Sequence, residues 1–162
     1  MQKNSIENTC CFIGHRKIVH SQELLERLST IITELVENGI SIFLFGSRSK
    51  FNDLCYNIVS ELREKYPYIR RIYVRAEYPI ISKDYEMYLL ESYEETFFPT
   101  ELYRAGKSVY VERNMYMIDN STVCVMYYRE DISYSKDCLM KKSGTKLALD
   151  YAIQKKKNIL RV

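Results

Sequence analysis

The chain has 162 residues, of which 46% are hydrophobic and 28% are charged, and its formal net charge at pH 7 is +3. This length predicts a single domain over residues 1–162, with enough apolar side chains for a core. The modest net charge does not indicate a nucleic-acid-binding surface, so nucleic acid is not the favoured partner.

No apolar run approaches the about 20 residues of a membrane helix, and the N-terminal residues lack the basic-then-apolar order of a signal peptide. We therefore expect a cytoplasmic protein that does not contact a membrane. Five cysteines without a Cys-x-x-Cys pair, together with two histidines, indicate neither a disulfide framework nor a metal site. We also expect no resident cofactor.

Buried strands and amphipathic helices alternate along the first half of the chain. Ser21 is the expected N-cap of the first helix, and Asn52 or Asp53 is the expected N-cap of the second. Short apolar runs, typical of strands buried on both faces of a parallel sheet, predict strands at residues 9–13, 40–45 and 69–74.

The second half begins with a less regular stretch, in which we expect a helix over 85–93 and a break at Pro99. Beyond it, the pattern predicts a helix over 110–120, a strand over 122–128, a mobile loop over the site at 129–142, a helix from 144 or 145 to 156, and a last strand over 158–162. Strands that alternate with helices indicate an α/β fold with a mainly parallel sheet of about five strands, covered on both faces. Ligands of such sheets bind beyond the carboxyl ends of the strands.

Small residues follow two of the predicted strands and begin the last predicted helix. Such turns present free backbone N–H groups and the positive end of a helix dipole, which together bind anions. Because the turns lie where strands end or helices begin, we expect them to meet in one phosphate- or ribose-binding crevice. The turns are Gly14-His15-Arg16, Gly46-Ser47-Arg48-Ser49, and Ser143-Gly144-Thr145 with Lys146.

Three side chains in or near these turns have more specific expected roles. Arg16 is expected to bind a phosphate or carboxylate through two parallel hydrogen bonds. His15 is either a general acid or base, or a side chain packed against the sheet. Asp53 either hydrogen-bonds the hydroxyls of a ribose or serves only as a helix N-cap.

Charged residues also follow the third predicted strand and begin the helix predicted over 110–120. Arg75 and Glu77 either contact the ligand or form an ion pair at the rim, where such pairs contribute little. Arg113 and Asn114 are expected to point from the start of a helix toward the crevice. That placement favours a role in binding.

Taken in order along the chain, these motifs resemble the SLOG superfamily, particularly its YpsA-like branch. The resemblance covers residues 9–162 and implies one Rossmann-like three-layer domain that binds nucleotides or nucleotide-derived ligands. Related families include the Lonely Guy phosphoribohydrolases, the Smf/DprA DNA-processing proteins and ligand-sensing modules of bacterial conflict systems. The residues that carry the resemblance are Gly14-His15-Arg16, Gly46-Ser47-Arg48, Arg113-Asn114 with Asp119, and Ser143-Gly144-Thr145.

The sequence departs from the enzymes of this superfamily in the last helix. The phosphoribohydrolases carry a catalytic Glu after their Gly-Thr pair, whereas this chain has Ala148 at the corresponding place, and alanine is neither a nucleophile nor a base. Arg48 also replaces a small residue of many relatives, which narrows or charges the pocket. We therefore expect a sensor or sequestering module for an NAD- or ADP-ribose-like nucleotide.

Two other functions stay open at this point. One is a hydrolase or transferase that acts on the glycosidic bond of a nucleotide or nucleoside, for which Glu77, Glu112 or Asp119 would supply the carboxylate; Glu112 and Asp119 are weak candidates for catalysis. The other is a nucleic-acid-associated protein, by analogy with Smf/DprA. The tyrosine-rich stretch 78–108 forms either a lid or a subunit interface, and we expect a homodimer or higher homo-oligomer.

Overall fold

The structure, a computed structural model, describes residues 6–130 and 143–162. Within these residues, six parallel strands form one sheet in the order β4-β3-β2-β1-β5-β6. The strands are β1 Thr9–Gly14, β2 Ile42–Phe45, β3 Arg70–Val74, β4 Glu95–Phe97, β5 Val123–Tyr127 and β6 Asn158–Arg161. The helices are α1 Gln22–Glu37, α2 Lys50–Lys65, α3 Lys83–Leu90, α4 Val109–Asp119 and α5 Gly144–Gln154, with short 3-10 helices η1 Ile6–Asn8, η2 Thr100–Arg104 and η3 Gly106–Ser108.

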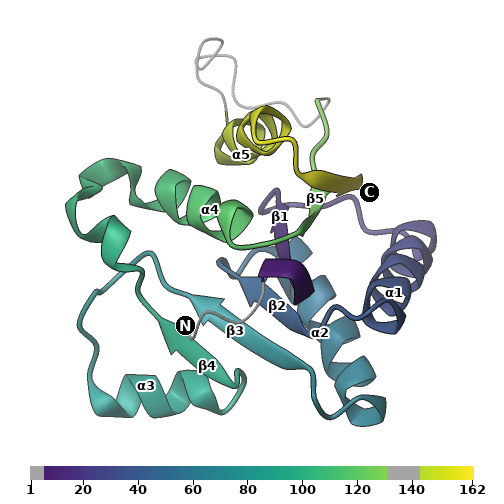
Figure 1. Cartoon of the computed structure of the whole chain (residues 1–162), viewed down its shortest axis with the longest axis horizontal. Helices are drawn as coiled ribbons and strands as arrows, with labels where there is room; N and C mark the ends of the chain where they lie inside the picture. The colour runs from purple at the N-terminus through teal and green to yellow at the C-terminus, as the bar shows by residue number, and fades with distance from the viewer. Residues whose placement is uncertain (1–5, 131–142) are drawn as a thin grey trace.

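Helices cover both faces of this sheet (Figure 1). On one face, α1 and α2 bury a cluster that includes Leu28, Phe43 and Phe51. On the other face, α4 and α5 bury a second cluster, which includes Met117 and Leu149. The predicted Rossmann-like, three-layer α/β fold is confirmed, with six strands instead of about five. None of the helices in the described residues combines the length and apolar character needed to cross a membrane.

Serine side chains cap the beginning of four helices, α1, α2, α3 and α5. The Ser21 hydroxyl accepts a hydrogen bond from the backbone N–H of Leu24 at 3.1 Å, so the predicted N-cap of α1 is confirmed. For α2, however, the N-cap is Ser49, whose hydroxyl accepts from the backbone N–H of Asn52 at 3.2 Å. The expected cap at Asn52 or Asp53 is therefore wrong, because the helix has already begun at Lys50.

The sixth strand, β4, is the element that the sequence pattern does not predict. It is three residues long, is an outermost strand and pairs with β3 in parallel, and ion pairs of Glu95 and of the preceding Glu94 add to this pairing. Arg71 Nη2 lies 2.6 Å from Glu94 Oε1, and Arg70 Nη2 lies 2.5 Å from Glu95 Oε2. A charged edge strand lacks the apolar run that marks a buried strand, since one of its sides is open to water.

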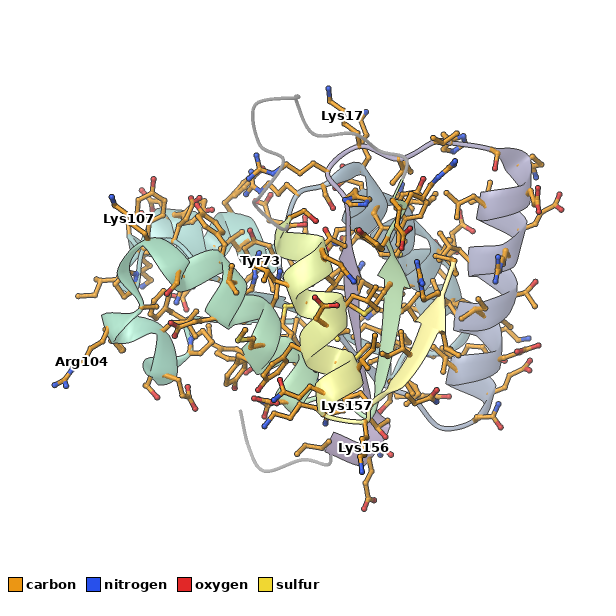
Figure 2. All side chains as sticks on the ribbon, turned by 90° about the horizontal axis from the view of Figure 1, so that it is seen from above. Lys17, Tyr73, Arg104, Lys107, Lys156 and Lys157 are labelled. Atoms are coloured by element: carbon orange, nitrogen blue, oxygen red, sulfur yellow. The ribbon has the colours of Figure 1, made fainter. Side chains whose placement is uncertain are left out.

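Because the strands are parallel, all of them end on the same side of the sheet, which we call the carboxyl edge. The helices that follow strands begin there. The strand order reverses between β1 and β5, because the chain leaves β1 for one face and β5 for the other. Figure 2 shows Lys17, just after β1, at the opposite end of the molecule from Lys156 and Lys157, just before β6. From residue 131 on, the loop expected at 129–142 lies outside the described residues.

Candidate functional site

The turn between β2 and α2 is held by an arginine of α4. Arg113, in the second turn of α4, donates a hydrogen bond from Nη1 to the backbone carbonyl of Gly46, and its Nε donates to Asn114 Oδ1 at 3.2 Å. A Cβ atom at Gly46 would lie 2.7 Å from Arg113 Nε and 2.6 Å from Met117 Sδ. Glycine is therefore needed at position 46 so that the Arg113 side chain can approach the backbone. The N–H of Gly46 is held in turn by the Asn52 side chain at 3.4 Å.

Arg113 is a buried cation, with only 6% of its surface exposed. Burial lowers its pKa to about 10, although Tyr73, Tyr110 and Glu77 oppose this shift. Within the described residues, no carboxylate lies at salt-bridge distance from Arg113. A guanidinium that has lost its water without gaining a carboxylate partner is electrostatically suited to an incoming anion.

The segment after β3 lies against the start of α4. Tyr110, in the first turn of α4, donates a hydrogen bond to the carboxylate of Glu77, which raises the pKa of the Tyr110 hydroxyl. Two residues before Glu77, the Nε and Nη1 atoms of Arg75 are covered and have no hydrogen-bond partner in the part of the chain that the structure describes. Arg75 and Glu77, predicted as either ligand contacts or a rim ion pair, do not form an ion pair with each other within residues 6–130 and 143–162.

The turn after β1 is tightly packed. A Cβ atom at Gly14 would lie 2.3 Å from the Phe51 ring, so this glycine lets α2 approach the strand. His15 is 3% exposed, and its Nε2 accepts a hydrogen bond from the backbone N–H of Arg129 at 3.1 Å. Burial lowers the pKa of His15, which keeps the ring neutral near pH 7. Of the two roles left open for His15, the geometry matches the packed side chain.

Arg16, by contrast, is exposed, and its backbone carbonyl accepts a hydrogen bond from Lys50 at the start of α2. The positive charges of Arg113 and Arg16 both act to lower the pKa of Tyr110, although its hydrogen bond to Glu77 dominates and raises it. Arg16 is thus near the first turn of α4. The two predicted arginines are brought to the same part of the carboxyl edge.

Hydroxyl groups fill the rest of the turn after β2. Ser47 Oγ donates to Ser49 Oγ at 3.0 Å, while Arg48 between them is exposed. Asp53 lies in the first turn of α2 and is also exposed. Partial loss of water around its carboxylate raises its pKa, and the charges of Lys50 and Arg48 act against that shift. Asp53 is not the N-cap, so of its two predicted roles only the ribose contact stays open.

The turn before α5 has a different character. Ser143 caps the helix by accepting a hydrogen bond from the N–H of Lys146 at 3.0 Å. The Lys146 ammonium is paired with Asp150 at 2.8 Å and lies over the Tyr128 ring, 5.7 Å from its centroid. Thr145 is 8% exposed, whereas Gly144 is exposed, and a Cβ atom there would meet no described atom within 4 Å. These residues lie at the carboxyl edge, but their polar groups are largely engaged within α5.

The two weak catalytic candidates do not gather around Arg113. Glu112 accepts a hydrogen bond from the Ser108 hydroxyl at 2.8 Å, next to the start of its own helix. Asp119 accepts hydrogen bonds from the Tyr151 hydroxyl at 2.8 and 2.9 Å, and Lys157 Nζ lies 3.4 Å from its backbone carbonyl. Lys157 marks the end of the molecule opposite the carboxyl edge (Figure 2), so Asp119 cannot supply a carboxylate to the predicted crevice.

Four tyrosines lie at the site although the sequence motifs do not assign them to it. Tyr73, the next-to-last residue of β3, lies near two arginines: burial raises its pKa, while the charges of Arg113 and Arg48 act to lower it. Tyr85 and Tyr88 of α3 contact Arg48, and Tyr110 holds Glu77. The sequence contains fifteen tyrosines, so the presence of a tyrosine near a motif did not by itself distinguish these four from the others.

A separate cavity of about 180 Å³ opens on the α1 side of the carboxyl edge. None of the residues predicted for the ligand site lines it. The residues that do are Val19, Ser21, Glu23, Leu24, Arg27, Tyr127, Arg129 and Val162. Because Arg27 of α1 donates to the Arg161 carbonyl of β6 at 3.1 Å and the Val19 N–H before α1 donates to Tyr127 of β5 at 3.0 Å, polar groups around this cavity are used in structural contacts.

Comparison with known proteins adds no relative: no protein-family model matches the chain, and no curated protein matches it. The function is therefore argued from the geometry of the carboxyl edge.

Proposed function

We propose that the protein binds a nucleotide or a nucleotide-derived anion, such as an NAD- or ADP-ribose-like molecule, at the carboxyl edge of its sheet, and acts as a sensor or sequestering module. The observation that carries this proposal is Arg113, a guanidinium that is 6% exposed and has no carboxylate at salt-bridge distance among the described residues. A phosphate would supply the missing negative charge and accept two parallel hydrogen bonds.

Neighbouring groups support an anion as the ligand. Arg75 has two covered nitrogens without an acceptor in the described residues, and Arg16 places a further positive charge near Tyr110. The helices α2 and α5 both begin at this edge, so the positive ends of their dipoles face the same region. A cationic ligand would meet repulsion from each of these features.

Features beyond charge favour a nucleotide over a simple anion. Ser47, one residue after the Gly46 carbonyl that Arg113 contacts, carries a half-buried hydroxyl suited to a sugar. Arg48, the next residue in the chain, contacts the half-buried Tyr85 and the exposed Tyr88. The order of motifs that resembles the SLOG superfamily supports the same ligand class.

The residue that corresponds to the catalytic Glu of the phosphoribohydrolases is Ala148, and this difference favours binding without catalysis. Ala148 is 1% exposed and packs in the core with Met117 and Ile118, so no carboxylate reaches the ligand from that turn of α5. At the carboxyl edge, the Glu77 carboxylate accepts a hydrogen bond from Tyr110 and is thus already engaged within the protein.

Isothermal titration calorimetry against AMP, NAD, ADP-ribose and cyclic ADP-ribose tests the proposal, with inorganic phosphate and spermidine as controls. We expect saturable binding of at least one nucleotide and none of spermidine. Failure of every nucleotide to bind at millimolar concentration would overturn the proposal. Chromatography of the same mixtures tests for catalysis: release of a free base, lost in Glu77→Gln, would assign the enzymatic function instead.

A further inference from the structure

Two tyrosines of α3 and one arginine form a flat, accessible surface beside the site. The rings of Tyr85 and Tyr88 are nearly parallel, with an interplanar angle of 19° and centroids 6.2 Å apart. Arg48 Nη2 lies 3.5 Å from the Tyr85 hydroxyl, and Arg48 Cζ lies 5.9 Å from the centroid of the Tyr88 ring. Tyr88 is 55% exposed and Arg48 is exposed, while Tyr85 is half-buried, so the Tyr88 ring and the Arg48 side chain are open to water.

Burial of the core does not explain this arrangement. Leu89 is the residue of α3 that is fully buried, while Met87, Tyr88 and Leu90 all keep roughly half of their surface exposed. Exposed aromatic rings beside a guanidinium are the groups on which nucleobases stack, because each offers a flat polarizable face. The surface therefore has the chemistry of a base-binding platform.

The position of this surface matches the position of the anion-binding groups. Gly46 and Arg48 are two residues apart in the turn after β2, so their Cα atoms are at most about 7 Å apart. At one end of this turn, the Gly46 carbonyl accepts from Arg113, and at the other end Arg48 contacts the two tyrosines. The same short turn therefore carries both contacts, and Ser47 stands between Gly46 and Arg48 in the chain.

We infer that Arg48, Tyr85 and Tyr88 form the platform on which the base of the bound nucleotide stacks. This inference rests on the proposed function, and it adds that the protein recognises the base of the nucleotide by stacking. Stacking tolerates any of the four bases, since every base has a π-face, so the platform would select nucleotides over sugar phosphates without a strong preference among bases. The sugar phosphate would be bound by the separate groups around Arg113.

The test compares two ligands that differ only in the base. Calorimetry would give the affinities of AMP and of ribose 5-phosphate for the wild-type protein and for Tyr88→Ala. We expect Tyr88→Ala to weaken AMP binding by about tenfold or more, the typical loss of one stacking ring, and to leave ribose 5-phosphate binding within about twofold. Tyr88→Phe keeps the ring and should bind AMP like the wild type.

Tyr68→Ala is the matched control, because Tyr68 is 58% exposed and lies before β3, at the edge of the sheet opposite the site. It should leave both affinities unchanged. If the wild type binds AMP and Tyr88→Ala binds it equally well, or loses both ligands equally, the platform is overturned while the proposed function stands. If the wild type binds neither ligand nor any other nucleotide, the proposed function itself fails.

Sedimentation velocity of the same variants separates stacking from subunit contact. We expect the wild type and Tyr88→Ala to sediment alike. A change in oligomeric state in Tyr88→Ala, with unchanged AMP affinity, would make this surface an interface between copies of the chain and would also overturn the platform.

Discussion

Gly46 and Gly144 both stand in small-residue turns that begin a helix at the carboxyl edge, yet their surroundings differ. A Cβ atom at Gly46 would meet Arg113 and Met117 below 3 Å, whereas one at Gly144 would meet no described atom within 4 Å. The turn after β2 is thus locked against α4, and the turn before α5 is open. Two motifs that look equivalent in the sequence therefore differ in what the glycine does: one admits a buried guanidinium, and the other leaves the backbone accessible.

The largest effect should follow from removing the cation of the locked turn. Arg113→Met should weaken binding of the nucleotide found by calorimetry by at least about 30-fold, since truncating one partner of a buried charged contact costs about 2–5 kcal/mol. Arg104→Met is the control, because Arg104 is exposed and projects from the far end of the molecule (Figure 2). An Arg113→Met protein that is folded and binds like the wild type would contradict the role of Arg113.

A stability measurement tests the locking itself. Gly46→Ala forces a methyl group into the space of Arg113 Nε and Met117 Sδ, so the free energy of unfolding should fall by about 1–3 kcal/mol. Urea denaturation followed by circular dichroism measures this change. An unchanged free energy of unfolding would show that Arg113 moves away at little cost, which would remove the distinction between the two turns.

A smaller effect is expected from pH, through His15 in the tightly packed turn after β1. The pKa of His15 is lowered in the folded protein by burial, so below pH 6.5 the unfolded chain binds a proton that the folded chain does not. The free energy of unfolding should therefore fall as the pH drops from 7.5 to 5.5. His15→Gln should show a flatter dependence when both proteins are unfolded in urea at the two pH values, and identical slopes would contradict this account.

The smallest effect should come from the open turn. Gly144→Ala meets no steric obstacle among the described residues and places alanine in the first turn of α5, so it should raise the free energy of unfolding by about 0.4–1 kcal/mol. In urea denaturation of both variants, the change in the free energy of unfolding should be positive for Gly144→Ala and negative for Gly46→Ala. A loss of stability in Gly144→Ala would mean that both turns are constrained.

Several elements of the fold were predictable from local pattern. Continuous apolar runs identify β1, β2 and β5, because a strand covered on both faces by helices has no polar side. The N-cap Ser21 also follows from the sequence, since the cap bond is made within three residues. β4 was not predictable, because its pairing with β3 and the ion pairs of Glu94 and Glu95 all involve residues more than twenty positions away in the chain.

In the candidate site, the motifs led to Arg16, Gly46 and Arg113, which the structure brings to the same edge of the sheet. Residue type alone did not show that Asp119 lies at the opposite edge of the sheet. It also did not decide the role of His15, whose ring accepts a hydrogen bond from the backbone of Arg129. In a parallel sheet, a helix begins near the carboxyl ends of the strands and ends near the beginning of the next strand. Only the beginning of a helix therefore faces the crevice. Asp119 ends α4 and therefore lies where strands begin.

The sequence by itself determined the class of the fold and the chemical character of the carboxyl edge, because apolar periodicity, helix caps and the placement of arginines after strands are local properties. Only the tertiary structure decided which charged groups are buried away from water without a carboxylate, or without a hydrogen-bond acceptor, beside them in the described residues. Burial of Arg113 against Gly46, coverage of the Arg75 nitrogens and the meeting of Arg48 with Tyr85 and Tyr88 all join segments distant in the chain. Desolvation is a property of the packed assembly, so no local pattern reports it.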